Sequence, residues 1–150
     1  MSAPPWKNIL VLVEGTAAAA KATEYAIRLA GATGAKLTAV SVVDTDTLKK
    51  LMSVRILVEQ EVREFEAQLA QNQQRYLSYA AQMARQAGVP MEAVLRTGTC
   101  HSEVLAEQKA RGADLIVIAE FRASLTKLDL AARERQLIME EAPCPVLVVK

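Results

Sequence analysis

Two segments near the carboxyl end decide the fold: Asp114-Leu-Ile-Val-Ile118 and Ala142-Pro-Cys-Pro-Val-Leu-Val-Val-Lys150. The first is an apolar run of strand length that opens into a loop, and a helical pattern follows the loop. In α/β proteins this arrangement commonly holds a phosphate, because helix N-terminal amides and a closely approaching glycine backbone bind the anion. The loop after Ile118 contains no glycine. The segment therefore suggests a nucleotide-binding fold that lacks its phosphate loop.

The composition favours one globular domain with an aliphatic core. The chain has 150 residues, of which 51% are hydrophobic and only 4% are aromatic. A domain of this size buries about two thirds of the surface that its unfolded chain exposes. The 18 basic and 17 acidic side chains give a net charge of +1, which disfavours binding to nucleic acid or to an anionic membrane. We expect residues 1–150 to form a single domain.

Nothing in the sequence indicates export, membrane insertion or a metal centre. Residues 1–7 lack the charged region and the apolar stretch of a signal peptide. No apolar run approaches the roughly 18 residues of a membrane span. Cys100 and Cys144 lack metal-ligand spacing, and His101 is the single histidine. We expect a cytoplasmic protein with two reduced thiols and no metal.

Apolar runs and helical periodicities alternate along the chain. The patterns predict strands at 8–13, 36–43, 89–96, 113–118 and 146–149, and helices at 17–32, 58–88, 102–111 and 130–141. Residues 44–47 are predicted as a turn, and residues 48–57 have the least defined pattern. The order predicts an α/β fold, a three-layer α/β/α sandwich with a five-stranded, mostly parallel, Rossmann-like sheet. Ligands of such sheets bind beyond the strand carboxyl ends, so one cleft should be rimmed by Glu14, Asp44, Gly98 and Ala119.

Four segments resemble the universal stress protein family over nearly the whole chain. They are Asn8-Ile-Leu-Val-Leu-Val-Glu-Gly-Thr16, Val94-Leu-Arg-Thr-Gly98, Gly112-Ala-Asp-Leu-Ile-Val-Ile118 and Ala142-Pro-Cys-Pro-Val-Leu-Val-Val149. The resemblance implies an adenine nucleotide alpha hydrolase-like fold, a part in the stress response and homodimerisation through the last strand.

The family's nucleotide-binding branch carries a loop of pattern G-x-x-G followed later by G-S or G-T. Counted from Asp114, the corresponding positions hold Ala119, Arg122, Ala132 and Arg133, and all four depart from the pattern. Alanine limits close backbone approach, and arginine cannot adopt positive φ cheaply. The resemblance also implies an adenine-side pocket, at positions occupied by Glu14, Gly15, Thr16 and Val42. By this comparison the chain is similar to the UspA-like branch, which does not bind ATP.

Two alternatives for the loop after Ile118 stay open. Arg122, Lys127 and Arg133 are cations near the former phosphate position, and they can hold a phosphate by charge. A solvated loop is favoured, because runs of charge are usually solvated. Its arginines would then pair with nearby carboxylates of Glu120, Asp129 or Glu134.

Cys100-His101-Ser102 stands at the start of a predicted helix. Helix N-termini lower a thiol pKa and histidine is a common general base, so the triplet suggests a nucleophile. Adjacent residues point in different directions, however, and the sequence identifies no third orienting group. Catalysis is therefore disfavoured.

These observations lead to a non-enzymatic, dimeric stress-response module without a cofactor and with protein partners that the sequence does not encode. The alternative is a nucleotide switch or very slow ATPase that holds ATP or AMP, with Mg²⁺, through Arg122 and Arg133. The last strand, Val146 to Val149, is apolar on both faces and should form a sheet edge. An open edge of this kind attracts a second strand, which favours a homodimer through residues 146–149.

Overall fold

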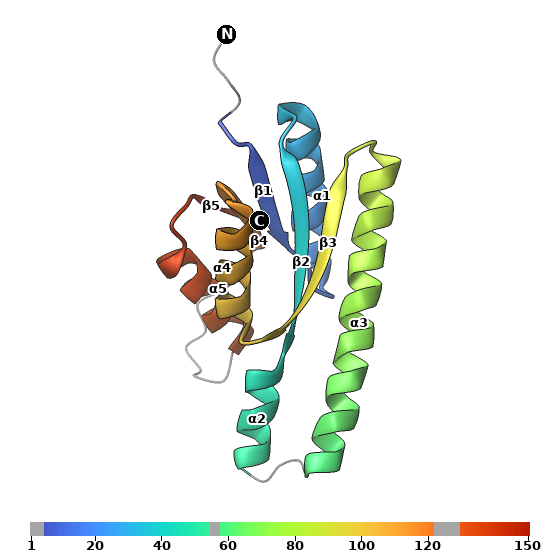
Figure 1. Ribbon diagram of the computed structural model, residues 1–150, viewed down its shortest axis with the longest axis vertical. Coiled ribbons are helices and arrows are strands. Elements are labelled where there is room, and N and C mark those ends of the chain that lie inside the picture. Colours follow the sequence, from blue (N-terminus) through green and yellow to red (C-terminus); the bar gives the residue numbers. More distant parts are fainter. Residues whose placement is uncertain (1–4, 55–57, 122–129) are drawn as a thin grey trace.

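The fold is known from a computed structural model that describes residues 5–54, 58–121 and 130–150. A five-stranded sheet has the order β3-β2-β1-β4-β5, and every neighbouring pair is parallel. The strands are β1 Asn8–Leu12, β2 Lys36–Asp44, β3 Met91–Gly98, β4 Leu115–Ala119 and β5 Val146–Val149. The helices are α1 Ala17–Thr33, α2 Thr45–Ser53, α3 Glu59–Gln86, α4 Cys100–Arg111 and α5 Leu130–Glu141. The predicted α/β class with a parallel Rossmann-like sheet is confirmed (Figure 1).

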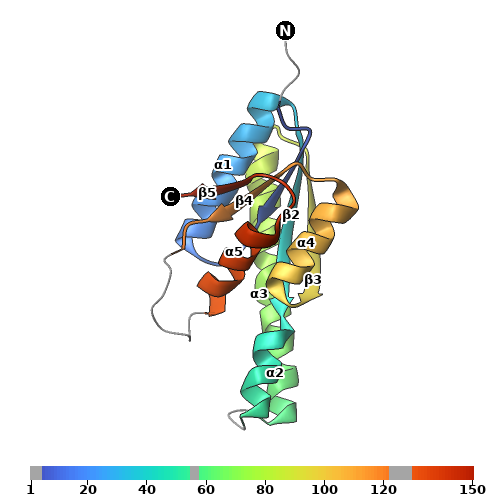
Figure 2. The same cartoon turned by 90° about the vertical axis from the view of Figure 1, so that its left-hand side faces the viewer.

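Helices cover both faces of the sheet. Helices α1 and α3 pack on one face, and α4 and α5 pack on the other (Figure 2). Helix α2 lies beyond the end of β2 instead, beside the first turns of α3 (Figure 1). The carboxyl ends of the strands point toward this side of the molecule, so α2 extends from the edge where ligands of parallel sheets bind.

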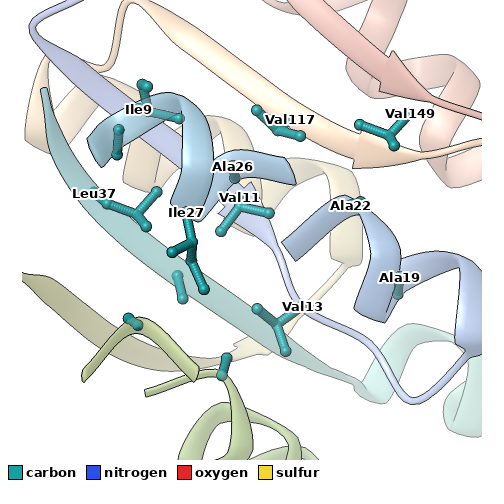
Figure 3. Packing of buried hydrophobic residues seen from close by; sticks show 14 of the residues in the cluster. Ile9, Val11, Val13, Ala19, Ala22, Ala26, Ile27, Leu37, Val117 and Val149 are labelled. Carbon is teal, nitrogen blue, oxygen red and sulfur yellow. The ribbon is translucent and has the colours of Figure 1, made fainter. Parts of the chain in front are cut away.

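The central strand β1 shows why its sequence is apolar without interruption. Ile9, Val11 and the following Val13 belong to the core under α1 and α3, whereas Leu10 and Leu12 belong to the core under α4 and α5. Side chains alternate between the two faces of a strand, and here both faces are covered by helices. Figure 3 shows the first of these cores, in which the small side chains of α1 let the helix lie close to β1.

The predicted strand and helix ends differ from the observed ones where turn chemistry decides. Strand β3 begins at Met91 and not at Val89, because the Val89 amide donates to the Ala84 carbonyl oxygen at 2.9 Å and closes the end of α3. Gly88 takes the left-handed conformation there, with φ of 71°, as is usual after a helix. Helix α4 begins at Cys100, earlier than the predicted Ser102.

The prediction of a turn at 44–47 and an undefined segment from residue 48 was wrong for residues 45–53, which form α2. Its Asp46 and Lys50 side chains pair at 3.2 Å, one helical turn apart, and Leu48 is buried. Thr and Asp at a helix start resemble a turn in sequence, because both also favour turns. Residues 55–57 of the predicted connection lie outside the described ranges.

The long helix α3 is confirmed, but its buried seam differs from the predicted stripe. The buried positions are Leu77, Ala80 and Ala84, and Phe65 of the predicted stripe is exposed. Only the second half of α3 lies against the sheet (Figure 1). Among the helices in the described ranges, none combines the length and apolar character of a membrane span.

Candidate functional site

The carboxyl ends of the parallel strands lie at one edge of the sheet, as predicted. Asp44 at the end of β2 stands in register with Gly98 at the end of β3. Strand β1 is in register with both β2 and β4, and Glu14 follows β1 after Val13. Helices α4 and α5 start close to the same edge (Figure 2).

A buried arginine, Arg135, lies at this edge of the sheet. Arg135 of α5 is only 9% exposed, and its Nη2 donates to the Glu14 carboxylate in an ion pair. The pair joins α5 to the loop after β1. The Arg135 Nε has no hydrogen-bond partner among the residues that the structure describes. Because a buried charge is costly unless it is paired, the Glu14 carboxylate is the group that permits Arg135 to lie here.

The surroundings of Cys100 are predominantly acidic. Burial raises the pKa of the Cys100 thiol far above its usual value, and the carboxylates of Glu14, Glu134 and Asp44 raise it further. The Arg135 guanidinium opposes them by lowering this pKa. Among the described residues, the charged groups that shift this pKa are therefore three carboxylates and one arginine.

The thiol-nucleophile hypothesis conflicts with this environment. Cys100 is 8% exposed, and its pKa is raised by burial and not lowered by the start of α4. A thiol needs a lowered pKa to react as thiolate near neutral pH. Cys100 therefore acts as a small core residue against β1, β2 and β4. Among the described residues, no group of histidine, cysteine and carboxylate side chains is arranged to hold a metal ion.

His101 joins α4 to α5. Its backbone amide donates to Glu134 Oε2 at 2.7 Å, and its ring Nδ1 lies 2.6 Å from the same oxygen. The Nε2 atom lies 3.5 Å from Ser102 Oγ and 3.8 Å from Glu141 Oε2. Glu134 is a carboxylate beside His101 that the sequence did not identify as its partner, and among the described residues it pairs with His101. The 3.5 Å between Ser102 Oγ and His101 Nε2 is longer than the usual hydrogen-bond distance for proton transfer. The contacts of His101 with Glu134 and Glu141 link helix α4 to helix α5.

The adenine-side positions implied by the resemblance are occupied by contacts within the chain. Gly15 lies so close to the ring of Tyr76 that a Cβ atom on it would overlap that ring. Thr16 caps α1, and its Oγ accepts from the Ala19 amide at 3.1 Å. Val42 is buried, and Gln73 Nε2 donates to its carbonyl oxygen at 3.4 Å.

The structure describes three of the four positions of the former phosphate loop. Ala119 is buried at the end of β4, and Ala132 is buried on α5. Arg133 also belongs to α5, but its residue is exposed. Arg122 and Lys127 lie outside the described residues. Of the predicted acids and cations that the structure describes, Glu14 and Asp44 lie at this edge of the sheet, and Arg133 is exposed.

Sequence reasoning singled out Arg133 and missed Arg135. The signal was helical spacing: Ala132, Arg135 and Ile138 recur every three residues in α5, and all three are buried. A helical face of this kind points to the core. An arginine on such a face requires an acidic partner, and the carboxylate after β1 was the available candidate.

The chain is similar to known proteins. The sequence profile described as the universal stress protein family matches residues 5–150. The chain belongs to the universal stress protein family. It is 26% identical to universal stress protein YxiE of Bacillus subtilis, over 97% of this chain and 99% of YxiE.

Solved universal stress proteins share the fold. One, determined in complex with cAMP, has a TM-score of 0.73 and 20% identity, with 99% of each chain covered. Another, from Archaeoglobus fulgidus and in complex with dAMP, has a TM-score of 0.65 and 18% identity, covering 96% of this chain and 98% of that one. At these identities the similarity establishes the fold.

The Glu14–Arg135 pair predicts an asymmetric effect of mutation. Glu14→Gln leaves the arginine buried without a counter-charge, whereas Arg135→Met leaves a carboxylate whose side chain is 23% exposed, against 11% for Arg135. Urea denaturation should therefore show a loss of about 2–4 kcal/mol for Glu14→Gln and a smaller loss for Arg135→Met. The double variant should lose less than the sum of the single losses, since neither charge is left unpaired.

The matched control is Asp46→Ala, which breaks the exposed pair with Lys50 and should change the free energy of unfolding by less than about 1 kcal/mol. Additive single losses in the double variant would show that the two side chains do not interact.

The Cys100 environment predicts slow thiol chemistry. Thiolate is the species that alkylates, and a raised pKa lowers the thiolate fraction at any pH below it. In a Cys144→Ser protein, iodoacetamide at pH 8 should modify Cys100 at least about tenfold more slowly than free cysteine, because one pKa unit is a tenfold change in thiolate. Unfolding in urea should restore the rate. Rapid alkylation of the folded protein, measured by mass spectrometry, would contradict the buried acidic environment.

Proposed function

We propose that this universal stress protein is a non-enzymatic, dimeric regulatory module of the cytoplasmic stress response and that it does not bind ATP. The observation that carries the proposal is the ion pair between Glu14 and Arg135. It engages the carboxylate that the resemblance assigns to the adenine side, inside the edge where ligands of parallel sheets bind.

Charge supports the absence of nucleotide binding. A nucleoside triphosphate brings several negative charges, and the groups around Cys100 include three carboxylates against one arginine. The arginine is already paired with Glu14. Binding ATP would require breaking this pair or placing phosphates close to these carboxylates, and both cost free energy.

Backbone chemistry supports the same conclusion. At the glycine positions of the family's phosphate loop the chain has Ala119, Arg122, Ala132 and Arg133. Glycine is used at such positions because the backbone can approach an anion closely and can adopt positive φ. The described members of this set are two buried alanines and an exposed arginine, which offer no equivalent cradle.

The alternative function is a nucleotide switch or very slow ATPase that uses Arg122 and Arg133 with Mg²⁺. Its support is that relatives of the same fold were solved in complex with cAMP and dAMP. In this alternative the exposed Arg133 side chain would bind phosphate by charge alone, without the lost glycines.

Calorimetric titration separates the two functions. Purified protein, shown by mass spectrometry to carry no nucleotide, is titrated with ATP, ADP, AMP and cAMP in Mg²⁺. We expect no binding tighter than a Kd of about 1 mM, equivalent to roughly −4 kcal/mol. Micromolar binding that disappears in Arg122→Ala/Arg133→Ala would establish the switch. Micromolar binding that survives this double variant would reject both the switch mechanism and our proposal.

Dimerisation is proposed through β5, which is an outer strand of the sheet. The Ile116 amide donates to the Pro145 carbonyl and the Glu120 amide donates to the Val149 carbonyl. In a parallel pair, hydrogen-bonding direction alternates along the strand, so Leu147 faces β4 whereas Val146 and Val148 direct their backbone groups outward. These outward groups can pair with β5 of a second copy, which would close the open edge.

Mutation of Val148, whose backbone amide points outward, tests this mode of dimerisation. Val148→Pro removes an outward amide and spares the bonds to β4, and Val148→Thr keeps both the amide and the β-branched shape. In sedimentation at micromolar concentration we expect a dimer for the wild type and for Val148→Thr, and a folded monomer for Val148→Pro. A wild-type monomer, or a Val148→Pro dimer, would reject pairing through this strand.

A further inference from the structure

A cavity of about 300 Å³ lies between the first turns of α1 and the middle of α3. Its walls include Val13, Ala17, Ala20, Ala80 and Met83. Helices α1 and α3 lie side by side on one face of the sheet (Figure 1), opposite the face that carries α4 and Arg135. The cavity opens on this helix face, and it shares Glu14 with the charged edge of the sheet.

Two tyrosines shape the cavity. The ring of Tyr76 lies directly over Gly15, where any larger residue would displace it. Tyr79, one helical turn further along α3, also lines the cavity and is 65% exposed. Aromatic rings at a wall and at a mouth favour flat ligands, because offset and edge-to-face ring contacts add to the hydrophobic gain.

The polar groups of the lining restrict the charge of a ligand. The Thr16 hydroxyl accepts from the Ala19 amide, and the Thr23 hydroxyl donates to the Ala19 carbonyl oxygen at 2.9 Å. The Glu14 carboxylate is paired with Arg135. The Tyr76 hydroxyl has no hydrogen-bond partner among the described residues. Among the described residues, no lysine or arginine lines the cavity, so an anionic ligand would lack a counter-charge beside Glu14.

Going beyond the proposed function, we propose that this cavity binds a small uncharged aromatic molecule, of one or two rings with one polar group, in contact with Tyr76. A volume of about 300 Å³ is at the lower end of the range for ligand pockets. The apolar walls supply the affinity, and the free phenol hydroxyl supplies one orienting hydrogen bond. Gly15 is then required for the position of Tyr76 as well as for the loop after β1.

The test uses indole as the neutral probe and indole-3-acetate as its anionic counterpart. Titration is followed by backbone amide chemical shifts of the full chain. We expect indole to bind with a Kd of about 0.1–1 mM, with shifts concentrated at Gly15, Tyr76 and Ala80. Indole-3-acetate should bind at least about fivefold more weakly, because its carboxylate approaches Glu14 without a partner cation.

Two alanines of α1 provide a matched pair of variants. Ala20 lines the cavity and is exposed, so Ala20→Phe fills the space without burying a new group in the core. Ala32→Phe places the same side chain at an exposed position of the same helix, outside the cavity lining. We expect indole binding to weaken at least about tenfold in Ala20→Phe, a loss of about 1.4 kcal/mol, and to be unchanged in Ala32→Phe.

A third variant, Tyr76→Phe, keeps the ring and removes the hydroxyl. It should weaken indole binding by about threefold while leaving the fold intact, as expected for one hydrogen bond. Absence of shifts up to 5 mM indole, roughly fivefold above the weakest expected Kd, would overturn the proposal. Equal binding by the wild type and Ala20→Phe would overturn it as well. Neither result decides whether ATP binds, which the separate calorimetric titration measures.

Discussion

The burial of Arg135 is the constraint on which the functional edge of the sheet depends. A guanidinium cannot be deprotonated in a protein, so it must be paired wherever it is removed from water. The available counter-charge is Glu14, the second residue after β1. The ion pair that meets this requirement holds the loop after β1 against α5. These two elements are far apart in the sequence.

The Glu14–Arg135 pair also bears on which ligands this edge of the sheet can hold. Arg135 is paired with Glu14, and the carboxylates of Glu14, Glu134 and Asp44 add to the effect of burial in raising the pKa of Cys100. Glu134 is in turn held by His101. A site that holds phosphate through helix amides needs the opposite balance of charge. The edge of the sheet has the parallel topology of a nucleotide-binding fold, and our proposal is that its charges disfavour the nucleotide.

The fold could be predicted from the sequence wherever burial produces a regular pattern of apolar residues. Strands β1 and β4 are continuous apolar runs because their alternate side chains enter two different cores, and helix α5 was predicted with the observed bounds. Helix α2 was missed because Asp and Thr serve helix starts and turns equally well. The predicted stripe of α3 is right in its second half, where Ala80 is buried and Tyr76 and Met83 pack against the core. It is wrong at Phe65, because the first half of α3 extends past the sheet (Figure 1).

The site was harder to predict than the fold, for a physical reason. Arg135 and Glu14 are separated by most of the chain, so neither residue carries a local signal of the other. The sequence does encode that Arg135 lies on a buried helical face, since Ala132 and Ile138 flank it at helical spacing. What it leaves open is which of several carboxylates completes the pair. Only the parallel topology, which brings the end of β1 beside α5, makes that choice.

The loop after β1 connects the two faces of the molecule through adjacent residues. Glu14 is tied to Arg135 on the α5 side, and Gly15 supports the ring of Tyr76 on the α3 side. The two residues share a peptide bond, so one short loop takes part both in the ion pair at the charged edge and in the lining of the apolar cavity.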